Sequence, residues 1–250
     1  MFRVGGALIA SILAVAAQPG TARSHHVPTD RIAALSRPAA TAQKPSANDP
    51  PAPSEAVTQL LHWVTLSNDN NGLPFMIIDK LGARIFVFDA EAQLLGTAPA
   101  LIGIARGDDS APGVGNQRLG KIPIEERTTP AGRFVARFGP AKGHPPVLWV
   151  DYGDAISLHP VVTSNRKERR LERIRSDNLD EHRISFGCIN VPASFYAKIV
   201  KPQFRSKNSR GVVYILPDTK PLAEVFPGIV VEASAPSSAP GRKTAAGGYR

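Results

Sequence analysis

Short apolar segments separated by turn residues run from residue 75 to residue 216, and this pattern constrains the fold more than any other feature. Phe75–Asp79 and Ala83–Asp89 flank a Lys80-Leu81-Gly82 turn, which predicts a hairpin. Further strand-like segments follow at 93–97, 134–138, 147–151, 155–159 and 211–216. The succession predicts a mainly β fold of the β-rich α+β kind, with a mixed sheet or sandwich and peripheral helices.

Three segments predict those helices. Ser54 is a good cap for residues 55–64, whose apolar residues recur at helical spacing. Residues 164–175 form a second candidate, rich in charges of both signs, and residues 192–200 form a third that begins with proline.

The first residues have the character of a secretory signal. A positive start is followed by a short apolar stretch from Val4 to Ala17, which ends in small residues before Gln18-Pro19-Gly20. An uncleaved membrane anchor is the alternative, but the apolar stretch is too short to span a bilayer comfortably. We therefore expect export to the periplasm or cell envelope, with no stable membrane insertion after cleavage.

Composition divides the rest of the chain. We expect a signal peptide at 1–17, a Pro- and Ala-rich disordered linker at 18–53, and a helix with its lead-in at 54–72. One domain is expected at 73–217, followed by a tail at 218–250 whose end is disordered.

Cys188 is the single cysteine of the chain and lies in the hexad Ser185-Phe186-Gly187-Cys188-Ile189-Asn190. It has no partner within the chain for a disulfide, so its thiol is a candidate nucleophile, although a lone cysteine can also be a small buried hydrophobe. Gly187 allows backbone N–H groups to approach a reacting carbonyl, which suggests oxyanion stabilisation around Gly187 and Cys188.

A base for this thiol is available upstream. His159 ends the strand-like segment 155–159 and can take the thiol proton and return it to a leaving amine. His182 is the competing candidate, six residues before Cys188. A metal site built from Cys188, His159 and His182 is the third option, but zinc ligands usually come in tighter pairs, so we predict no metal and no cofactor.

Together these residues resemble the L,D-transpeptidase (YkuD-type) catalytic domain. That family has a strand histidine followed by S/T-H-G-C, a hydrophobic residue and Arg or Asn, with T-P-x-G-x-F/Y upstream. Ser185, Gly187, Cys188, Ile189 and Asn190 match by position, His159 matches the histidine, and 129–134 matches the upstream segment. The resemblance spans residues 73–217 and places Ser185 and Asn190 beside the nucleophile, where they can bind substrate or hold the loop.

Two departures are visible. Phe186 stands where the family has histidine, which predicts a drier thiol with a raised pKa and slow acylation at neutral pH. A charged insert, residues 164–183, lengthens the segment between His159 and Ser185 beyond the family's usual spacing. The insert is either a solvated helix or a lid over the cleft.

The resemblance implies an exported peptidoglycan enzyme that forms an acyl-enzyme on Cys188 with stem tetrapeptides and transfers it to an amine. Water as the acceptor would make it an L,D-carboxypeptidase or amide hydrolase, and loss of activity would leave a non-catalytic wall-binding module. The formal charge of +9 could indicate nucleic acid. Export instead favours carboxylate-bearing stem peptides as partners, with no nucleic acid.

Overall fold

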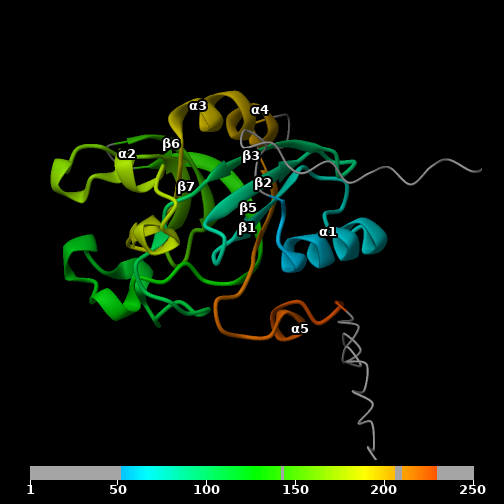
Figure 1. The fold of residues 1–250 in the computed structure, drawn as a ribbon, viewed down its shortest axis with the longest axis horizontal. Coiled ribbons are helices and arrows are strands. Elements are labelled where there is room, and N and C mark those ends of the chain that lie inside the picture. The colour runs from blue at the N-terminus through cyan, green and yellow to red at the C-terminus, as the bar shows by residue number, and fades with distance from the viewer. Residues whose placement is uncertain (1–51, 142–143, 206–209, 230–250) are drawn as a thin grey trace, which may run out of the picture. The chain divides into compact units, whose positions relative to one another are not determined.

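A single mixed sheet of eight strands dominates the structure, a computed structural model that describes residues 52–141, 144–205 and 210–229 (Figure 1). The strand order is β3-β2-β1-β10-β5-β6-β7-β9; β1 pairs in parallel with β10 and β7 with β9, and the other neighbours are antiparallel. The strands are β1 (Phe75–Asp79), β2 (Arg84–Phe88), β3 (Leu94–Pro99), β5 (Gly132–Ala141), β6 (His144–Asp151), β7 (Ile156–Pro160), β9 (Ile189–Val191) and β10 (Arg210–Ile215). The predicted mainly β class and the first hairpin are confirmed.

A second, two-stranded sheet lies next to the cysteine motif. Its strands are β4 (Ile102–Gly103) and β8 (Arg183–Ser185), which pair in parallel. Through β8 and β9 the cysteine motif is therefore held between two sheets.

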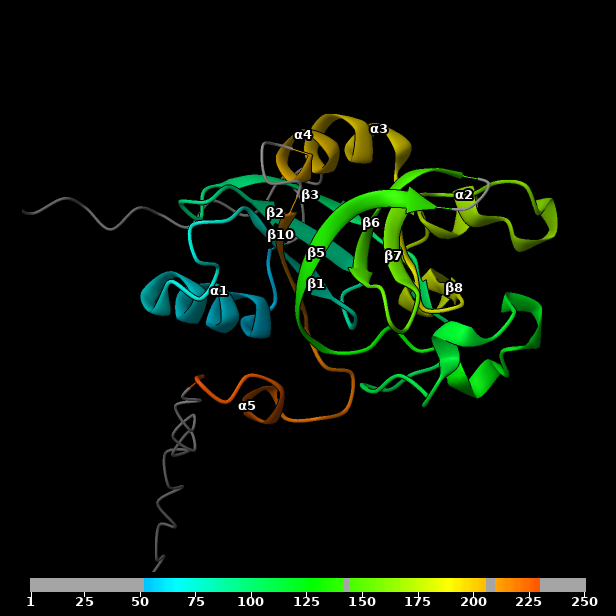
Figure 2. The same ribbon diagram turned by 180° about the vertical axis from the view of Figure 1, so that it is seen from behind.

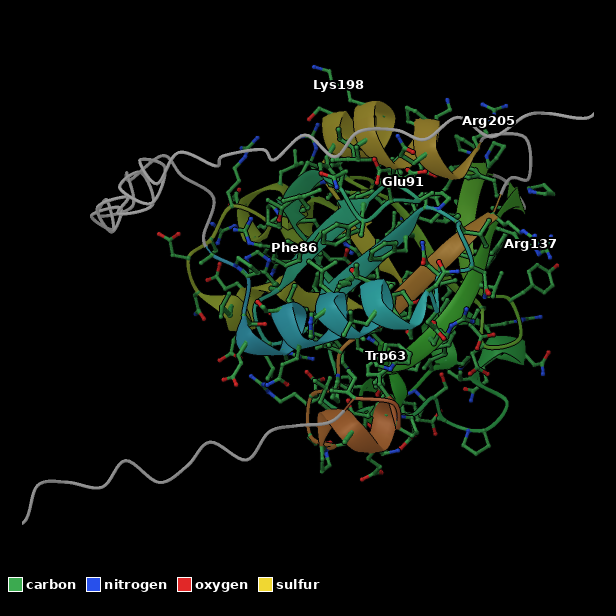
Figure 3. The ribbon with its side chains drawn as sticks, turned by 90° about the vertical axis from the view of Figure 1, so that its right-hand side faces the viewer. Trp63, Phe86, Glu91, Arg137, Lys198 and Arg205 are labelled. Carbon is green, nitrogen blue, oxygen red and sulfur yellow. The ribbon has the colours of Figure 1, made fainter. Side chains whose placement is uncertain are left out.

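Helices cover both faces of the large sheet. Helix α1 (Glu55–Ser67) begins as predicted at Ser54, whose Oγ accepts the N–H of Val57, and ends at Asn68 in the left-handed region. It buries Val57, Leu60 and Val64 against the half of one face formed by β1, β2 and β10. Figure 3 shows α1 lying across these strands. The helix does not cover the half of that face formed by β5, β6 and β7.

The opposite face is covered by α3 (Ala193–Phe195), a π-helical turn (Tyr196–Val200) and α4 (Lys201–Phe204), which run on from one another (Figure 2). Tyr196, Val200 and Phe204 pack into the core beneath them. The helix predicted at 192–200 is thus present and continues to residue 204. The π turn comes just before Pro202, which has no N–H to donate to the preceding turn.

The segment after β10 packs beside α1. Helix α5 (Leu222–Val225) is followed by the buried side chains of Phe226 and Ile229. Trp63 of α1 contacts Phe226, with ring centroids 6.4 Å apart, and lies between α1 and α5 (Figure 3). The residues from 222 to 229 therefore pack against α1 and its side of the sheet.

The charged insert does not form the long helix predicted at 164–175. It contains a 3₁₀ turn (Arg166–Glu168), the short α2 (Arg170–Arg173) and a second 3₁₀ turn (Leu179–His182). Arg169 separates the first two because its φ of 49° is left-handed, which no helix tolerates. Further 3₁₀ turns lie at Val114–Asn116, Leu119–Lys121 and Ile124–Glu126.

The predicted signal peptide, nearly all of the linker and the end of the tail lie outside the described residues. Among the residues that are described, no helix combines the length and apolar character needed to cross a bilayer.

Candidate active site

Cys188 lies in the short connection between β8 and β9, with its side chain partly exposed. Gly187 before it has a φ of 122°, which favours glycine. A Cβ at this position would lie 2.7 Å from the carbonyl oxygen of Thr128 and 2.8 Å from Ile156 Cδ1. The glycine is therefore required both by the backbone conformation and by the packing around the cysteine.

Ser185 holds this connection from inside. Its hydroxyl donates to the carbonyl of Cys188 at 2.6 Å and accepts the N–H of Gly187 at 3.0 Å. Ser185 is buried, so the structure favours the loop-holding alternative over direct substrate contact. Because the N–H of Gly187 is directed at Ser185, the N–H of Cys188 is the better candidate for an oxyanion donor.

Ser157 is a contact of the thiol that the sequence did not single out. Its Oγ lies 3.5 Å from Cys188 Sγ, which also approaches the carbonyl oxygen of Ala155 at 3.7 Å. Ser157 precedes His159 by two residues on β7, so both side chains are on one face of the strand. That alternation is the signal from which Ser157 could have been found.

His159 is anchored by one ring nitrogen. Its Nδ1 lies 2.8 Å from the carbonyl oxygen of Pro160, which can only accept, so Nδ1 carries a proton. Nε2, which also faces the side-chain amide of Asn190, is therefore the nitrogen that can exchange a proton with Cys188. The structure thus brings the predicted base and the predicted nucleophile together at the ends of β7 and β9.

The electrostatics of the pair favour a reactive thiol. Burial raises the pKa of Cys188, but interactions with His159 and Ser157 outweigh it and bring the pKa below that of an ordinary cysteine. Burial likewise lowers the pKa of His159, while its interaction with Cys188 and with the Pro160 carbonyl raises it above its usual value. The raised thiol pKa expected from Phe186 is therefore not what the structure indicates.

Asn190 is fully buried and connects His159 to the charged insert. Its Nδ2 lies 3.2 Å from His159 Nε2, and its Oδ1 accepts a hydrogen bond from Arg170 NH1 at 2.5 Å. Like Ser185, Asn190 is engaged with the protein rather than open to a substrate. This contact joins α2 to β9, and α2 lies near β7 (Figure 2).

His182, the competing base, has a structural role. Its ring is buried, with Nδ1 3.0 Å from the carbonyl of Ala100 and Nε2 3.0 Å from that of Ser176. Both nitrogens are thus occupied by backbone, which favours His159 as the base.

Phe186, two residues before Cys188, contacts a cation. The guanidinium of Arg127 stacks over its ring, 4.1 Å from the centroid, while Nε and NH2 of Arg127 donate to the carbonyl of Ile122. The phenylalanine ring is therefore held in place by a cation–π contact.

An open groove of about 300 Å³ lies on the half of the sheet that α1 does not cover. Trp149 and Tyr152 form one side of it, with ring centroids 5.1 Å apart, and Val135 and Arg137 line another part. Arg137, Trp149 and Ser157 pair directly across β5, β6 and β7, so they share a face. The groove therefore opens on the same face of the sheet as Ser157.

Among the described residues, no group of three or more His, Cys, Asp and Glu side chains is arranged so that it could hold a metal ion.

No family model matches the chain, and no curated protein matches its sequence. Solved structures give partial similarities. The helical cell shape determining protein Pgp2 of Campylobacter jejuni, as a point mutant, is 13% identical with a TM-score of 0.38 over 70% of this chain and 64% of that one. An L,D-transpeptidase of Xylanimonas cellulosilytica is 14% identical with a TM-score of 0.33 over 57% and 60%.

The catalytic domain of the E. faecium L,D-transpeptidase is 16% identical with a TM-score of 0.32, over 57% of this chain and 96% of that domain. The present chain spans less than two thirds of the Pgp2 and Xylanimonas chains.

Proposed function

We propose that the protein is an exported L,D-transpeptidase-like enzyme that uses Cys188 to transfer peptidoglycan stem peptides. The observation that carries the proposal is the arrangement around the thiol: His159, fixed through Nδ1, interacts with a thiol whose pKa is lowered. A nucleophile, a base and a group that orients the base are the elements that covalent acyl transfer needs.

In the first half-reaction the thiol proton moves to Nε2 of His159, and the thiolate attacks the carbonyl carbon of the third-position diamino acid. A C–S bond forms and the C–N bond to the terminal D-alanine breaks. The imidazolium returns its proton to the departing amine. The N–H of Cys188 is suited to stabilise the oxyanion, since Gly187 turns the backbone at this point.

In the second half-reaction an amine attacks the thioester carbon, its proton passes to His159, and the thiolate leaves. The side-chain amine of a second stem gives a cross-link, whereas water gives a carboxypeptidase. The groove with Trp149 and Tyr152 offers apolar surface on the same face of the sheet as Ser157. The charge of +9 favours carboxylate-bearing stems in the cell envelope.

The test is the mass of the purified protein after incubation with a carbapenem. We expect an adduct equal to the whole ring-opened drug, located on the peptide that contains Cys188 and absent from Cys188→Ala. Incubation with a tetrapeptide stem, with and without a diamino-acid acceptor, then separates transpeptidase from carboxypeptidase by the product. If the folded protein forms neither the adduct nor a product, the proposed activity is wrong and the interpretation as a non-catalytic wall-binding module remains.

A further inference from the structure

Arg170 joins the charged insert to the candidate base. NH1 of Arg170 donates to Asn190 Oδ1 at 2.5 Å, and Asn190 Nδ2 lies 3.2 Å from Nε2 of His159. The Arg170 side chain is about nine-tenths buried, and its Nε is paired with Glu168 at 2.5 Å. An arginine on a solvated surface helix is rarely buried to this extent. Arg170 is therefore part of the surroundings of the candidate base.

The guanidinium decides which way the Asn190 amide faces. Arginine can only donate hydrogen bonds, so the atom of Asn190 that faces it must be the carbonyl oxygen. The NH2 group is then directed at His159 Nε2. Because Asn190 is fully buried, no water competes for either end of the amide.

An N–H donor directed at Nε2 suits a neutral imidazole and opposes an imidazolium. With Nδ1 protonated towards Pro160, the lone pair of neutral His159 is on Nε2 and accepts from Asn190. Protonation of Nε2 would place two N–H groups against each other. The lone pair that must take the Cys188 proton is therefore the one that Asn190 occupies.

We propose that Arg170 is a positioning residue that restrains the base: by holding the Asn190 amide towards Nε2 it limits formation of the Cys188–His159 ion pair. The inference rests on the proposed function insofar as it concerns acylation. In this arrangement a displacement of α2 would release the amide, allow its oxygen to turn towards the imidazolium, and raise the reactivity of the thiol.

The charge of Arg170 acts in the same direction. The charged and titratable groups around His159 are Cys188, which favours the imidazolium, and Arg170, which lowers the pKa of His159. Glu168 pairs with Arg170 and partly neutralises it. The amide orientation and the charge thus both oppose proton uptake by His159.

The test compares Arg170→Met with Arg169→Met in the full chain. Arg169 is the neighbouring arginine, largely exposed and paired with Glu172, so it controls for loss of a charge from the insert. The rate of thiol alkylation by iodoacetamide, measured against pH, gives the pKa of Cys188 without turnover. We expect Arg170→Met to lower this pKa and Arg169→Met to leave it unchanged; one pKa unit corresponds to about tenfold more thiolate on the acid limb.

Below neutral pH, Arg170→Met should also be acylated by the carbapenem faster than the wild type, in parallel with its lowered thiol pKa. Arg170→Gln keeps a donor for Asn190 without the charge, so it should shift the thiol pKa in the same direction by less; it also serves if Arg170→Met does not fold. A raised or unchanged thiol pKa in the folded variants overturns the inference. If alkylation shifts as expected while no form of the protein is acylated, the restraint on His159 stands and the proposed function fails.

Discussion

The hydroxyl of Thr129 donates a hydrogen bond of 2.7 Å to the carbonyl of Gly187, the residue directly before the nucleophile. Thr129 is held in turn by the N–H of Gly103, which its Oγ1 accepts at 2.8 Å, and by Lys80, which donates to its carbonyl at 2.9 Å. The backbone before Cys188 is therefore held through Thr129 by buried polar groups: the N–H of Gly103 on β4 and the side chain of Lys80, which directly follows β1.

Lys80 and Asp108 are the charged centre of this support. Their side chains are buried and 2.9 Å apart, and Asp108 also accepts the backbone N–H groups of Asp218, Thr219 and Lys220. Replacing Lys80 by Met leaves a buried carboxylate without its cation, which should cost about 3–5 kcal/mol of unfolding free energy. The measurement is urea unfolding, with Lys220→Met as the control because Lys220 pairs with Asp109 at the surface.

Asp108 should also make the fold acid-sensitive. Burial raises its pKa, but its hydrogen bonds to residues 218–220 and to Lys80 outweigh this and hold the pKa far below its usual range. A depressed folded-state pKa gives stability that is present above the unfolded pKa and is lost as the pH falls towards the folded one. We therefore expect the unfolding free energy to fall below about pH 4, and less steeply in Asp108→Asn, as followed by circular dichroism.

His159 and His182 should separate into a base and a structural residue. His159→Gln should slow carbapenem acylation about 10²-fold or more with little change in stability, since a positioned base is lost. His182→Gln should cost about 1–3 kcal/mol of unfolding free energy, because it disrupts contacts to one buried and one partly buried carbonyl. The folded fraction should be acylated at the normal rate. Stopped-flow measurement of the acylation rate, together with thermal unfolding of both variants, tests this. If His182→Gln slows acylation more than His159→Gln does, the base role passes to His182.

The sequence predicted the hairpin and the capped α1 because both depend on local signals, namely turn residues and apolar spacing. It paired Cys188 with His159 only through the resemblance to a family motif, since the two residues are far apart in the chain. It did not predict the Lys80–Asp108 pair, whose members are 28 residues apart. Lys80 stands in a turn and Asp108 in a Gly-rich loop, both typical of surface positions. Only the folded chain shows that the two side chains are buried against each other.

The role of Arg170 was hidden for a related reason. The mixed charges of residues 166–175 favour a solvated helix, and several of them do pair within the insert. What distinguishes Arg170 is its long-range contact to Asn190 on β9, which no spacing rule encodes. The motif itself identified Asn190, but not the direction in which its amide faces.

The pH dependence of acylation tests the state of the thiol. The pKa of Cys188 is lowered and that of His159 is raised. As the pH increases, the acylation rate should therefore first rise, at a pH below the pKa of an ordinary cysteine, because the thiolate forms. It should fall again at higher pH, where His159 loses its proton. Phe186→His should then change the plateau by less than about tenfold, since the thiol is already activated. A wild-type rate that climbs steadily to alkaline pH would instead restore the view that the family histidine is needed.

Gly187→Ala tests the geometry of the nucleophile directly. The new Cβ would meet the Thr128 carbonyl at 2.7 Å and Ile156 Cδ1 at 2.8 Å, at a φ of 122° that strains any other residue. The connection must shift, so carbapenem acylation should fall by at least about 10²-fold, the cost of misplacing a reacting atom by about 1 Å. Gly113→Ala is the matched control, because Gly113 also has a positive φ, 74°, but no atom lies within 4 Å of its Cβ position. Gly113→Ala should lose about 1–2 kcal/mol of stability to backbone strain and keep its acylation rate. Equal acylation in both folded variants would show that the backbone at Gly187 does not set the position of the thiol.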